Sequence, residues 1–230
     1  MKMKKQLLTL VTVCAIAMGA NAQTEKGDNL IGGSVGFNYN NQKPLNSGNT
    51  LVTGNSRSFN IAPRFGHFFG KNLAVGLQVG YAKNKTNSTS TLIQGNGSLQ
   101  FSNSTTNSNS FNAIPYVRYY VDVADKFKFF GEGAVGVAFG KTKYNYAYSS
   151  YNINQTTSYK TTQYLASVNP GFAFFPTKKW AIEFSFPLIS YNKFKQKDDG
   201  TNVNSEASSS ESFTFAFSSF SPSIGFNFHF

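Results

Sequence analysis

Large apolar side chains alternate with small or polar ones along most of this chain, with a period of two residues. In the segment 72–82 the bulky members are Leu73, Val75, Leu77, Val79 and Tyr81, and the residues between them are alanine, glycine and glutamine. A period of two is typical of β-strands, whose successive side chains point to opposite faces of the sheet. We therefore predict that the chain is built from strands.

Eight segments share this alternation and are predicted to be strands. They are approximately Leu30–Tyr39, Arg57–Phe69, Asn72–Ala82, Phe111–Val121, Phe127–Gly140, Thr162–Phe175, Lys179–Ser190 and Phe213–Phe230. The connections between them alternate in length. The long ones are Asn40–Ser56, Lys83–Ser110, Lys141–Thr161 and Tyr191–Ser212, and the short ones are Gly70–Lys71, Asp122–Lys126 and Pro176–Lys178.

The chemistry of the second face of these strands indicates a membrane protein. A soluble sheet carries Lys, Glu and Thr on its solvent face, whereas here that face consists of Gly, Ala, Ser and Asn, and no lysine falls within the core of a predicted strand. Large apolar side chains outside and small or polar ones inside are the pattern of transmembrane β-barrels, which have short periplasmic turns and long extracellular loops. We therefore predict an all-β fold, an eight-stranded antiparallel up-and-down transmembrane β-barrel of this topology.

Four prolines recur along the predicted strands, at Pro63, Pro115, Pro170 and Pro222. Their spacings of 52, 55 and 52 residues indicate four similar hairpins, which supports the count of eight strands. Because proline forfeits a hydrogen bond of the ladder, we predict bulges or locally weak pairing at these positions.

The first 22 residues are typical of a secretory signal peptide. A basic start is followed by the apolar stretch Leu7–Met18 and by small residues before Gln23. We predict cleavage after Ala22, which leaves one domain, residues 23–230, and removes Cys14, the only cysteine. The domain then has no disulfide and no thiol ligand or nucleophile. Its 18 basic and 10 acidic side chains give a net charge of +8.

Three short sequences carry a family resemblance: Ala20-Asn21-Ala22 before the cleavage point, residues 31–37 (IGGSVGF) and residues 224–230 (IGFNFHF). They resemble the small outer-membrane barrels related to the OmpA transmembrane domain, OmpX and OmpW, in the style of Bacteroidetes porin-family proteins. The resemblance covers essentially all of residues 23–230. It implies a barrel that is integral to a bacterial outer membrane.

The last predicted strand carries two further signals. Phe226, Phe228 and Phe230 resemble the terminal aromatic signal that the outer-membrane assembly machinery recognises. Phe213, Phe215 and Phe217 are out of phase with the even-numbered residues from Phe220 onward, which predicts a bulge near Ser218 and Ser219.

Five polar residues within the predicted strands face the lumen by alternation and lie at a similar depth: Arg64, Gln78, Arg118, Glu132 and Glu183. Buried charges require partners, so we predict that they form a lumen charge network. The interior of an eight-stranded barrel is only just wide enough for side chains, and we interpret the network as a plug. A gate that passes small solutes or ions is the alternative.

The excess lysines gather at the outer ends of the ascending strands. Lys83, Lys85, Lys141 and Lys143 continue the outward phase, whereas Lys193–Lys197 are predicted to be out of phase. Lipopolysaccharide carries phosphates at this level, so we predict contacts between these four lysines and its phosphates. The alternative is that they only extend toward water and solubilise the strand ends.

The predicted outer loops differ in composition. Asn84–Asn109 and Gly200–Ser212 are rich in Ser, Thr and Asn, which predicts mobile, solvated segments. The segment Asn145–Tyr159 is rich in tyrosine, which we interpret as a hairpin prolonged above the membrane. Contact with a host surface or partner is the alternative.

These features favour a non-enzymatic outer-membrane barrel that contributes to envelope integrity and surface interaction, with a largely plugged lumen. The alternative is a narrow channel for small solutes or apolar molecules. A lipid-modifying enzyme is disfavoured, because His67 and His229 both lie near periplasmic strand ends and neither is predicted to be catalytic. We expect no metal, no cofactor and no nucleic acid. The expected partners are outer-membrane lipid, lipopolysaccharide and the assembly machinery, and we expect a monomer.

Overall fold

The computed structural model of the chain describes residues 24–47, 50–93, 95, 99–148, 153–200, 208–216 and 223–230. These residues form ten strands, and they include no helix long and apolar enough to cross a membrane. The strands are β1 (Asn29–Ser47), β2 (Thr50–Gly70), β3 (Leu73–Ile93), β4 (Leu99–Ala124), β5 (Phe127–Tyr148), β6 (Ile153–Phe174), β7 (Trp180–Ser185), β8 (Ile189–Asp198), β9 (Ser208–Phe215) and β10 (Ser223–His229).

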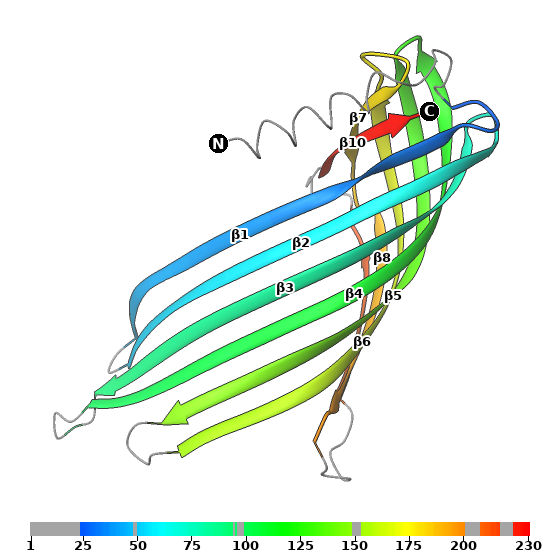
Figure 1. Ribbon diagram of the computed structural model, residues 1–230. Helices are drawn as coiled ribbons and strands as arrows, with labels where there is room; N and C mark the ends of the chain where they lie inside the picture. The colour runs from blue at the N-terminus through cyan, green and yellow to red at the C-terminus, as the bar shows by residue number, and fades with distance from the viewer. Residues whose placement is uncertain are drawn as a thin grey trace, which may run out of the picture.

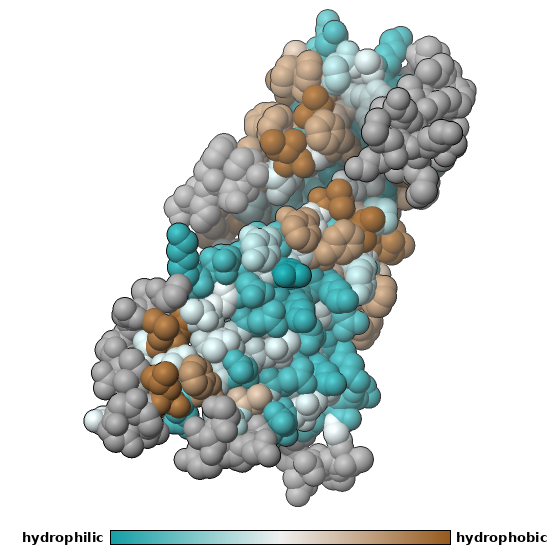
Figure 2. All heavy atoms as spheres, turned by 60° about the vertical axis from the view of Figure 1, so that its left-hand side comes forward, coloured by the Kyte–Doolittle hydropathy of each residue, from teal (hydrophilic) through white to brown (hydrophobic). Residues whose placement is uncertain are grey.

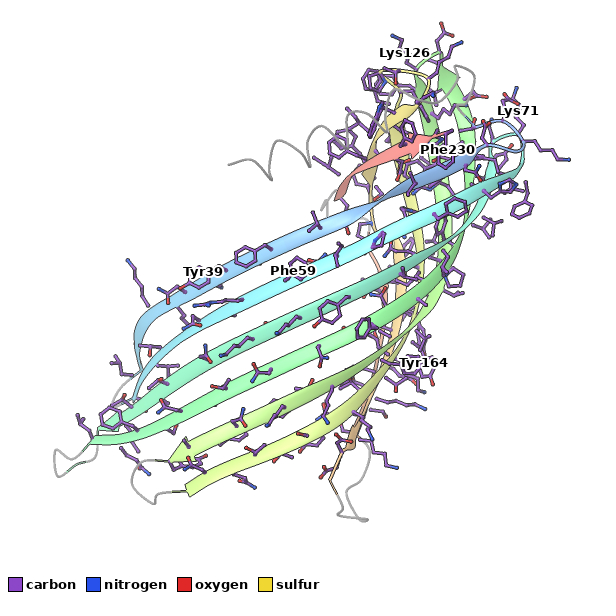
Figure 3. The ribbon with its side chains drawn as sticks, viewed as in Figure 1. Tyr39, Phe59, Lys71, Lys126, Tyr164 and Phe230 are labelled. Atoms are coloured by element: carbon purple, nitrogen blue, oxygen red, sulfur yellow. The ribbon has the colours of Figure 1, made fainter. Side chains whose placement is uncertain are left out.

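All ten strands belong to one antiparallel sheet. Strands β1 to β6 pair in chain order, β6 then pairs with both β7 and β8, β8 pairs with β9, and β10 pairs with both β7 and β1. The pairings therefore form a closed ring at the end of the molecule that holds Phe230 and the short turns at Lys71 and Lys126 (Figures 1 and 3). We call this end the turn end, and the opposite one the hairpin end.

The all-β, antiparallel, up-and-down architecture is confirmed, but the structure has ten strands where the sequence predicted eight. The predicted strand Lys179–Ser190 is divided into β7 and β8, which pair with successive parts of β6. The break contains Pro187, which has no N–H to donate. The predicted strand Phe213–Phe230 is represented by β9 and β10, and residues 217–222 lie outside the described residues, together with the bulge predicted near Ser218 and Ser219.

The predicted weak pairing at the prolines is confirmed at three of the four positions. The β2–β3 ladder skips the residue pairs at Ala62 and Pro63, and the β4–β5 ladder skips those at Ile114 and Pro115. At Pro170 the register changes by one residue, from Val168 opposite Ile189 to Gly171 opposite Ser185. Such a change is a bulge, and it reverses which face the following residues occupy. Pro222 lies outside the described residues.

The prediction of mobile outer loops is wrong for most of their length. Residues 83–93 and 99–110 continue β3 and β4, and β5 and β6 extend to Tyr148 and from Ile153. The interpretation of the tyrosine-rich segment as a prolonged hairpin is thus confirmed. Residues 208–212 belong to β9, whereas residues 201–207 are not described.

Side-chain hydrogen bonds between neighbouring strands explain why such polar segments stay paired. Asn87 of β3 donates to Asn55 of β2 at 3.0 Å and accepts from Thr105 of β4 at 3.1 Å. Thr89 donates to Asn103 at 2.8 Å. Cross-strand pairs of this kind stabilise a ladder although they bury little apolar surface. Composition alone favoured a loop because it does not reveal such pairings.

The outer face is apolar in a band next to the turn end and polar beyond it. Val35 and Phe37 are each 73% exposed, and Tyr39, Phe59 and Tyr164 are also exposed (Figure 3). On the side shown in Figure 2, hydrophobic side chains gather over the upper part, and hydrophilic ones cover most of the lower part. Large exposed apolar patches of this extent require a non-aqueous neighbour.

The buried apolar core lies inside the ring at the turn end. It comprises Leu30, Phe68, Ala74, Tyr120, Phe130, Ala173, Phe175 and Ala181. Backbone hydrogen bonds between Asn29 and Phe230, at 2.7 and 2.9 Å, join the first residue of β1 to the last residue of the chain beside this core. The β1–β10 ladder that closes the ring has four residue pairs.

Because this ladder is short, a side chain added to it is expected to be costly. A Cβ on Gly32 would lie 1.8 Å from Oδ1 of Asn227, whereas a Cβ on Gly225 of the same ladder region would meet nothing within 4 Å. We expect Gly32→Ala to lower the free energy of unfolding by about 1–3 kcal/mol, and Gly225→Ala to change it by less than about 0.5 kcal/mol. Urea titration in lipid vesicles, followed by the fluorescence of Trp180, measures both, and equal effects would contradict the tight closure described here.

Candidate functional site

The lumen charge network joins residues from four strands of the ring. Arg64 lies on β2, Arg118 on β4, Glu132 on β5 and Glu183 on β7. Arg118 and Glu132 are directly opposite each other in the β4–β5 ladder, whereas Glu183 reaches them from β7, three positions from β4 around the ring. All four side chains point inward, as the alternation in the sequence predicted, because successive residues of a strand face opposite sides of the sheet.

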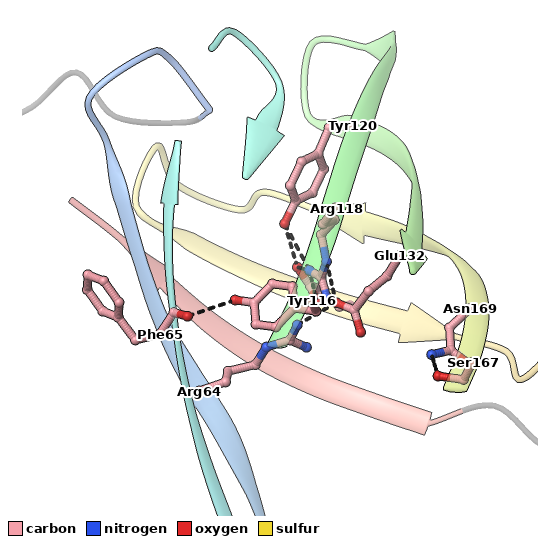
Figure 4. A network of polar contacts seen from close by, with 9 residues as sticks. Arg64, Phe65, Tyr116, Arg118, Tyr120, Glu132, Ser167 and Asn169 are labelled. Atoms are coloured by element: carbon pink, nitrogen blue, oxygen red, sulfur yellow. Dashed lines mark hydrogen bonds and ion pairs between the residues drawn. The ribbon is translucent and has the colours of Figure 1, made fainter. Parts of the chain in front are cut away.

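Arg118 is the centre of this network (Figure 4). Its guanidinium donates to Glu132 at 2.7 Å and to both carboxylate oxygens of Glu183 at 2.7 Å. Glu132 also accepts from Arg64. The side chains of Arg118 and Glu183 are only 2% and 5% exposed. Two cations and two anions at one level leave no net charge, which is the condition for keeping them away from water.

Aromatic side chains complete the network, and sequence reasoning missed them. Tyr120 accepts a hydrogen bond from Arg118 at 2.9 Å and donates one to Glu183 at 3.1 Å. The guanidinium carbons of Arg64 and Arg118 lie 4.1 Å from the ring centres of Tyr116 and Phe130, respectively. These contacts are cation–π interactions. The sequence could have predicted them, because Tyr116 and Tyr120 are two residues before and after Arg118 on β4 and so face the same side of the sheet.

The fifth predicted member, Gln78, borders the same space. It lies opposite Arg64 in the β2–β3 ladder and lines a cavity of about 130 Å³ together with the four charged residues. Asn227 of β10 also lines this cavity. The structure therefore brings together all five residues predicted from the sequence, with Gln78 at the edge of the network.

A second polar cluster, not predicted from the sequence, lies nearer the turn end. The ammonium group of Lys128 on β5 donates to Thr24 at 2.8 Å and to Asn72 at 3.2 Å, and it forms an ion pair with Asp122 at 2.5 Å. Lys128 and Thr24 are buried. Lys128 precedes Glu132 by four residues on β5, so the alternation of this strand predicts that both side chains face the lumen.

Together these residues form three layers across the lumen. Along β4 the inward side chains are Arg118, Tyr120 and Asp122, and along β5 the side chains at the same levels are Glu132, Phe130 and Lys128. The middle layer is aromatic, with Phe68, Phe175 and His229 next to Tyr120 and Phe130. Successive layers are two residues apart, about 6.6 Å along a strand.

The two histidines occupy structural positions. Nδ1 of His67 lies 2.9 Å from Oδ1 of Asn29, and its ring stands edge-on to Phe69 at 4.9 Å. His229 is buried, with its ring centre 5.2 Å from that of Phe175. Both lie at the turn end, as the sequence predicted.

The predicted lysines are on the outer face, and one prediction about their neighbours is wrong. Lys83, Lys85, Lys141 and Lys143 are all exposed. The third set, Lys193–Lys197, is not out of phase. The bulge opposite Pro170 shifts the alternation, so that these residues pair with the outward residues of β6.

The terminal aromatic residues lie along the ring-closing strand. Phe226 is exposed, and the ring of Phe228 lies 5.0 Å from Trp180 and 5.9 Å from Phe230. All three have the same parity and follow the outer face. Their predicted role as an assembly signal stays a prediction.

A family model for the outer membrane protein β-barrel domain matches residues 7–228. The chain belongs to this family. It is an integral protein of the outer membrane, and the expectation that it resembles small outer-membrane barrels is confirmed. No curated protein sequence matches the chain.

Solved structures of outer-membrane proteins are similar to the chain at low identity. OprG from Pseudomonas aeruginosa is 13% identical, with 91% of this chain and 99% of OprG covered and a TM-score of 0.41. Ail, the attachment invasion locus protein of Yersinia pestis, is 17% identical, with 89% and 99% covered and a TM-score of 0.33. A second structure of Ail, in complex with the heparin analogue sucrose octasulfate, is 16% identical, with the same coverage and a TM-score of 0.35.

Removing Arg118 tests whether the network is a coupled unit. Arg118→Met leaves the Glu183 carboxylate buried without its cation, so we expect the free energy of unfolding to fall by about 3–5 kcal/mol. In the double variant Arg118→Met/Glu183→Leu, both charges are replaced by apolar side chains, and most of this loss should be recovered.

Urea titration of the wild type, the two single variants and the double variant in lipid vesicles measures the coupling. Gln78→Ala, at the edge of the same cavity, is the matched control and should change stability little. Additive effects of the two single substitutions would contradict a direct pairing of Arg118 with Glu183.

Proposed function

We propose that this protein is a non-enzymatic barrel of the outer membrane that contributes to envelope integrity and surface interaction, with its lumen closed by side chains. The observation that carries the proposal is the stack of three layers described above. An ion-pair layer around Arg118, an aromatic layer around Tyr120 and a polar layer around Lys128 follow one another across the same bore. Most polar groups of the ion-pair and Lys128 layers have partners within their own layer, although Nε of Arg64 has none, and this favours a permanently packed interior over a passage.

We further propose that the ten strands correspond to eight membrane-spanning strands of one barrel. β7 and β8 then form the seventh spanning strand, interrupted at Pro187, and β9 and β10 form the eighth. Removal of residues 1–22 during export leaves Thr24 close to the mature N-terminus, where it can join Lys128. The turn end faces the periplasm in this arrangement, and the hairpin end faces the outside of the cell.

The length of the strands supports a role at the surface. β4 has 26 residues, whereas about 9–11 residues of a tilted strand cross the membrane. The hairpins β1–β2, β3–β4 and β5–β6 therefore extend well beyond the lipid, and their side chains there are largely Ser, Thr, Asn and Tyr. A stiff polar extension of this kind presents a surface to the surroundings and is unlike a mobile loop.

A narrow channel is the second candidate, and one observation favours it. A cavity of about 520 Å³ lies in the lumen on the hairpin side of the charge network, lined by Ser58, Asn60, Asn84, Ser110, Gln163 and Gln196, among others. A solute could enter this vestibule and reach Arg118. To go further it would have to displace the ion pairs and then the aromatic layer.

Ion conductance in planar lipid bilayers separates the two candidates. The proposal predicts no channel activity for the wild-type protein and none for Glu132→Ala, because the aromatic layer beneath the ion pairs remains in place. Phe130→Ala is the companion variant that opens the aromatic layer while leaving the ion pairs.

A channel, by contrast, requires current in the wild type and a change of ion selectivity in Glu132→Ala, since a negative charge is lost from its narrowest part. That result would overturn the closed lumen. The shift in gel mobility between heated and unheated samples shows whether each variant has folded before it is tested.

A further inference from the structure

Three lysines stand directly opposite one another on the outer face, toward the hairpin end. Lys141 of β5 pairs with Lys160 of β6, and Lys160 pairs with Lys197 of β8. All three side chains are exposed. Like charges directly opposite each other destabilise a sheet. The row is therefore favourable only when anions lie against it.

The chain supplies one of these anions. Asp199 forms ion pairs with Lys141 and, at 2.7 Å, with Lys160. Hydrogen bonds from the two lysines lower the pKa of this carboxyl to about 2. One carboxylate against three ammonium groups leaves two positive charges, and Lys143, two residues further along β5, adds a third. Each ammonium group has three donors, so the row retains donors for an external anion.

An apolar groove runs along the same strands below the lysine row. Two adjoining hollows of about 520 and 510 Å³ share Pro115, Val135, Ala166 and Tyr191 in their linings. The groove exists because small residues replace bulky ones on the outer face there. A Cβ added to Gly133, which lines the larger hollow, would meet nothing within 4 Å.

The separation of the groove from the lysine row matches the dimensions of a lipid. Val135 precedes Lys141 by six residues on β5, which is about 20 Å along a strand. A strand tilt of about 40° converts this into a depth of about 15 Å, half of the hydrocarbon thickness of the membrane. A molecule with its anionic group on the lysines would therefore place an acyl chain in the groove.

We propose that this face binds lipopolysaccharide as a specific ligand, with phosphates of its lipid A on Lys141, Lys160 and Lys197 and one acyl chain in the groove at Gly133. The proposal rests on the outer-membrane location and on charge complementarity, and it does not depend on whether the lumen is closed. Lipid A fits because it carries phosphates and several acyl chains on one sugar unit, which can engage a row of cations and a groove together.

The other basic group of the outer face lacks the second half of such a site. Arg57 lies opposite Lys85, and Lys83 precedes Lys85 on β3 by two residues. Below them the outward side chains of β3 are bulky: Tyr81, Val79 and Leu77, none of which lines the groove. This group has three exposed cations, as the lysine row has, so it provides a control for electrostatic attraction alone.

Native mass spectrometry of the folded protein in detergent, with defined lipids added, tests the proposal. The probes are bisphosphorylated lipid A, the same lipid without phosphates, and phosphatidylglycerol. We expect the wild type to prefer the first probe over both others. Lys141→Ser/Lys160→Ser/Lys197→Ser should weaken binding of bisphosphorylated lipid A by about 100-fold, from the contribution of three basic residues. Arg57→Ser/Lys83→Ser/Lys85→Ser should weaken it much less.

The groove has its own matched pair of variants. Gly133→Leu fills it and should weaken lipid A binding by roughly ten-fold, the order expected when an apolar group loses its buried surface. Gly131→Leu adds the same side chain at an equally open outward glycine that does not line the groove, and it should leave binding unchanged.

Three results would overturn the proposal. Equal losses in the two triple variants would show that any cluster of cations suffices. Equal binding of phosphatidylglycerol and lipid A would assign the site to phosphorylated lipids in general. Unchanged binding in Gly133→Leu would show that the groove does not hold an acyl chain. Lipid A binding and ion conductance are independent measurements. Loss of the lipid A preference would contradict this proposal alone, and conductance of the wild type would contradict the closed lumen alone.

Discussion

The contact on which the interior depends is the bridge from Arg118 to two carboxylates on two different strands of the ring. Glu132 comes from the neighbouring strand β5, whereas Glu183 comes from β7, three positions from β4 around the ring. A guanidinium group can serve both because its donors form a planar fork. The short β1–β10 ladder that completes the ring holds only four residue pairs, so an inner crosslink of this kind supplements the backbone pairing. The buried charges are tolerable because they balance within one layer.

The inward and outward faces of the same strands carry different kinds of side chain. Inward residues carry the ion pairs, the aromatic layer and the Lys128 cluster, and outward residues carry the apolar band and the lysine row. The bulge opposite Pro170 connects the two, because the change of register turns Lys193–Lys197 outward and aligns Lys197 with Lys160. A single irregularity in one ladder thus determines the chemistry of the outer face at the hairpin end.

Alternation along the chain was sufficient to predict the all-β, up-and-down architecture and the meeting of Arg64, Arg118, Glu132 and Glu183, and short terminal sequences carried the family resemblance. The number of strands and the extent of the outer hairpins were not predictable in the same way. Pro187 lies in the break between β7 and β8, opposite the register change at Pro170 of β6, and Asn87 stabilises β3 because Asn55 and Thr105 lie beside it. Both depend on register, which sequence composition does not reveal. The side of the sheet on which Lys193–Lys197 lie was predicted wrongly for the same reason. Lys128 and Tyr120, by contrast, alternate with the inward residues of their strands, so the sequence alone could have placed them in the lumen.

The central claim is that the three layers close the lumen. Osmotic swelling of proteoliposomes in isotonic solutions of small neutral solutes, such as glycerol and single amino acids, tests it most directly. A closed lumen predicts swelling rates equal to those of protein-free liposomes at every protein density. Swelling that rises in proportion to the amount of folded protein, and falls as solute size increases, would contradict it.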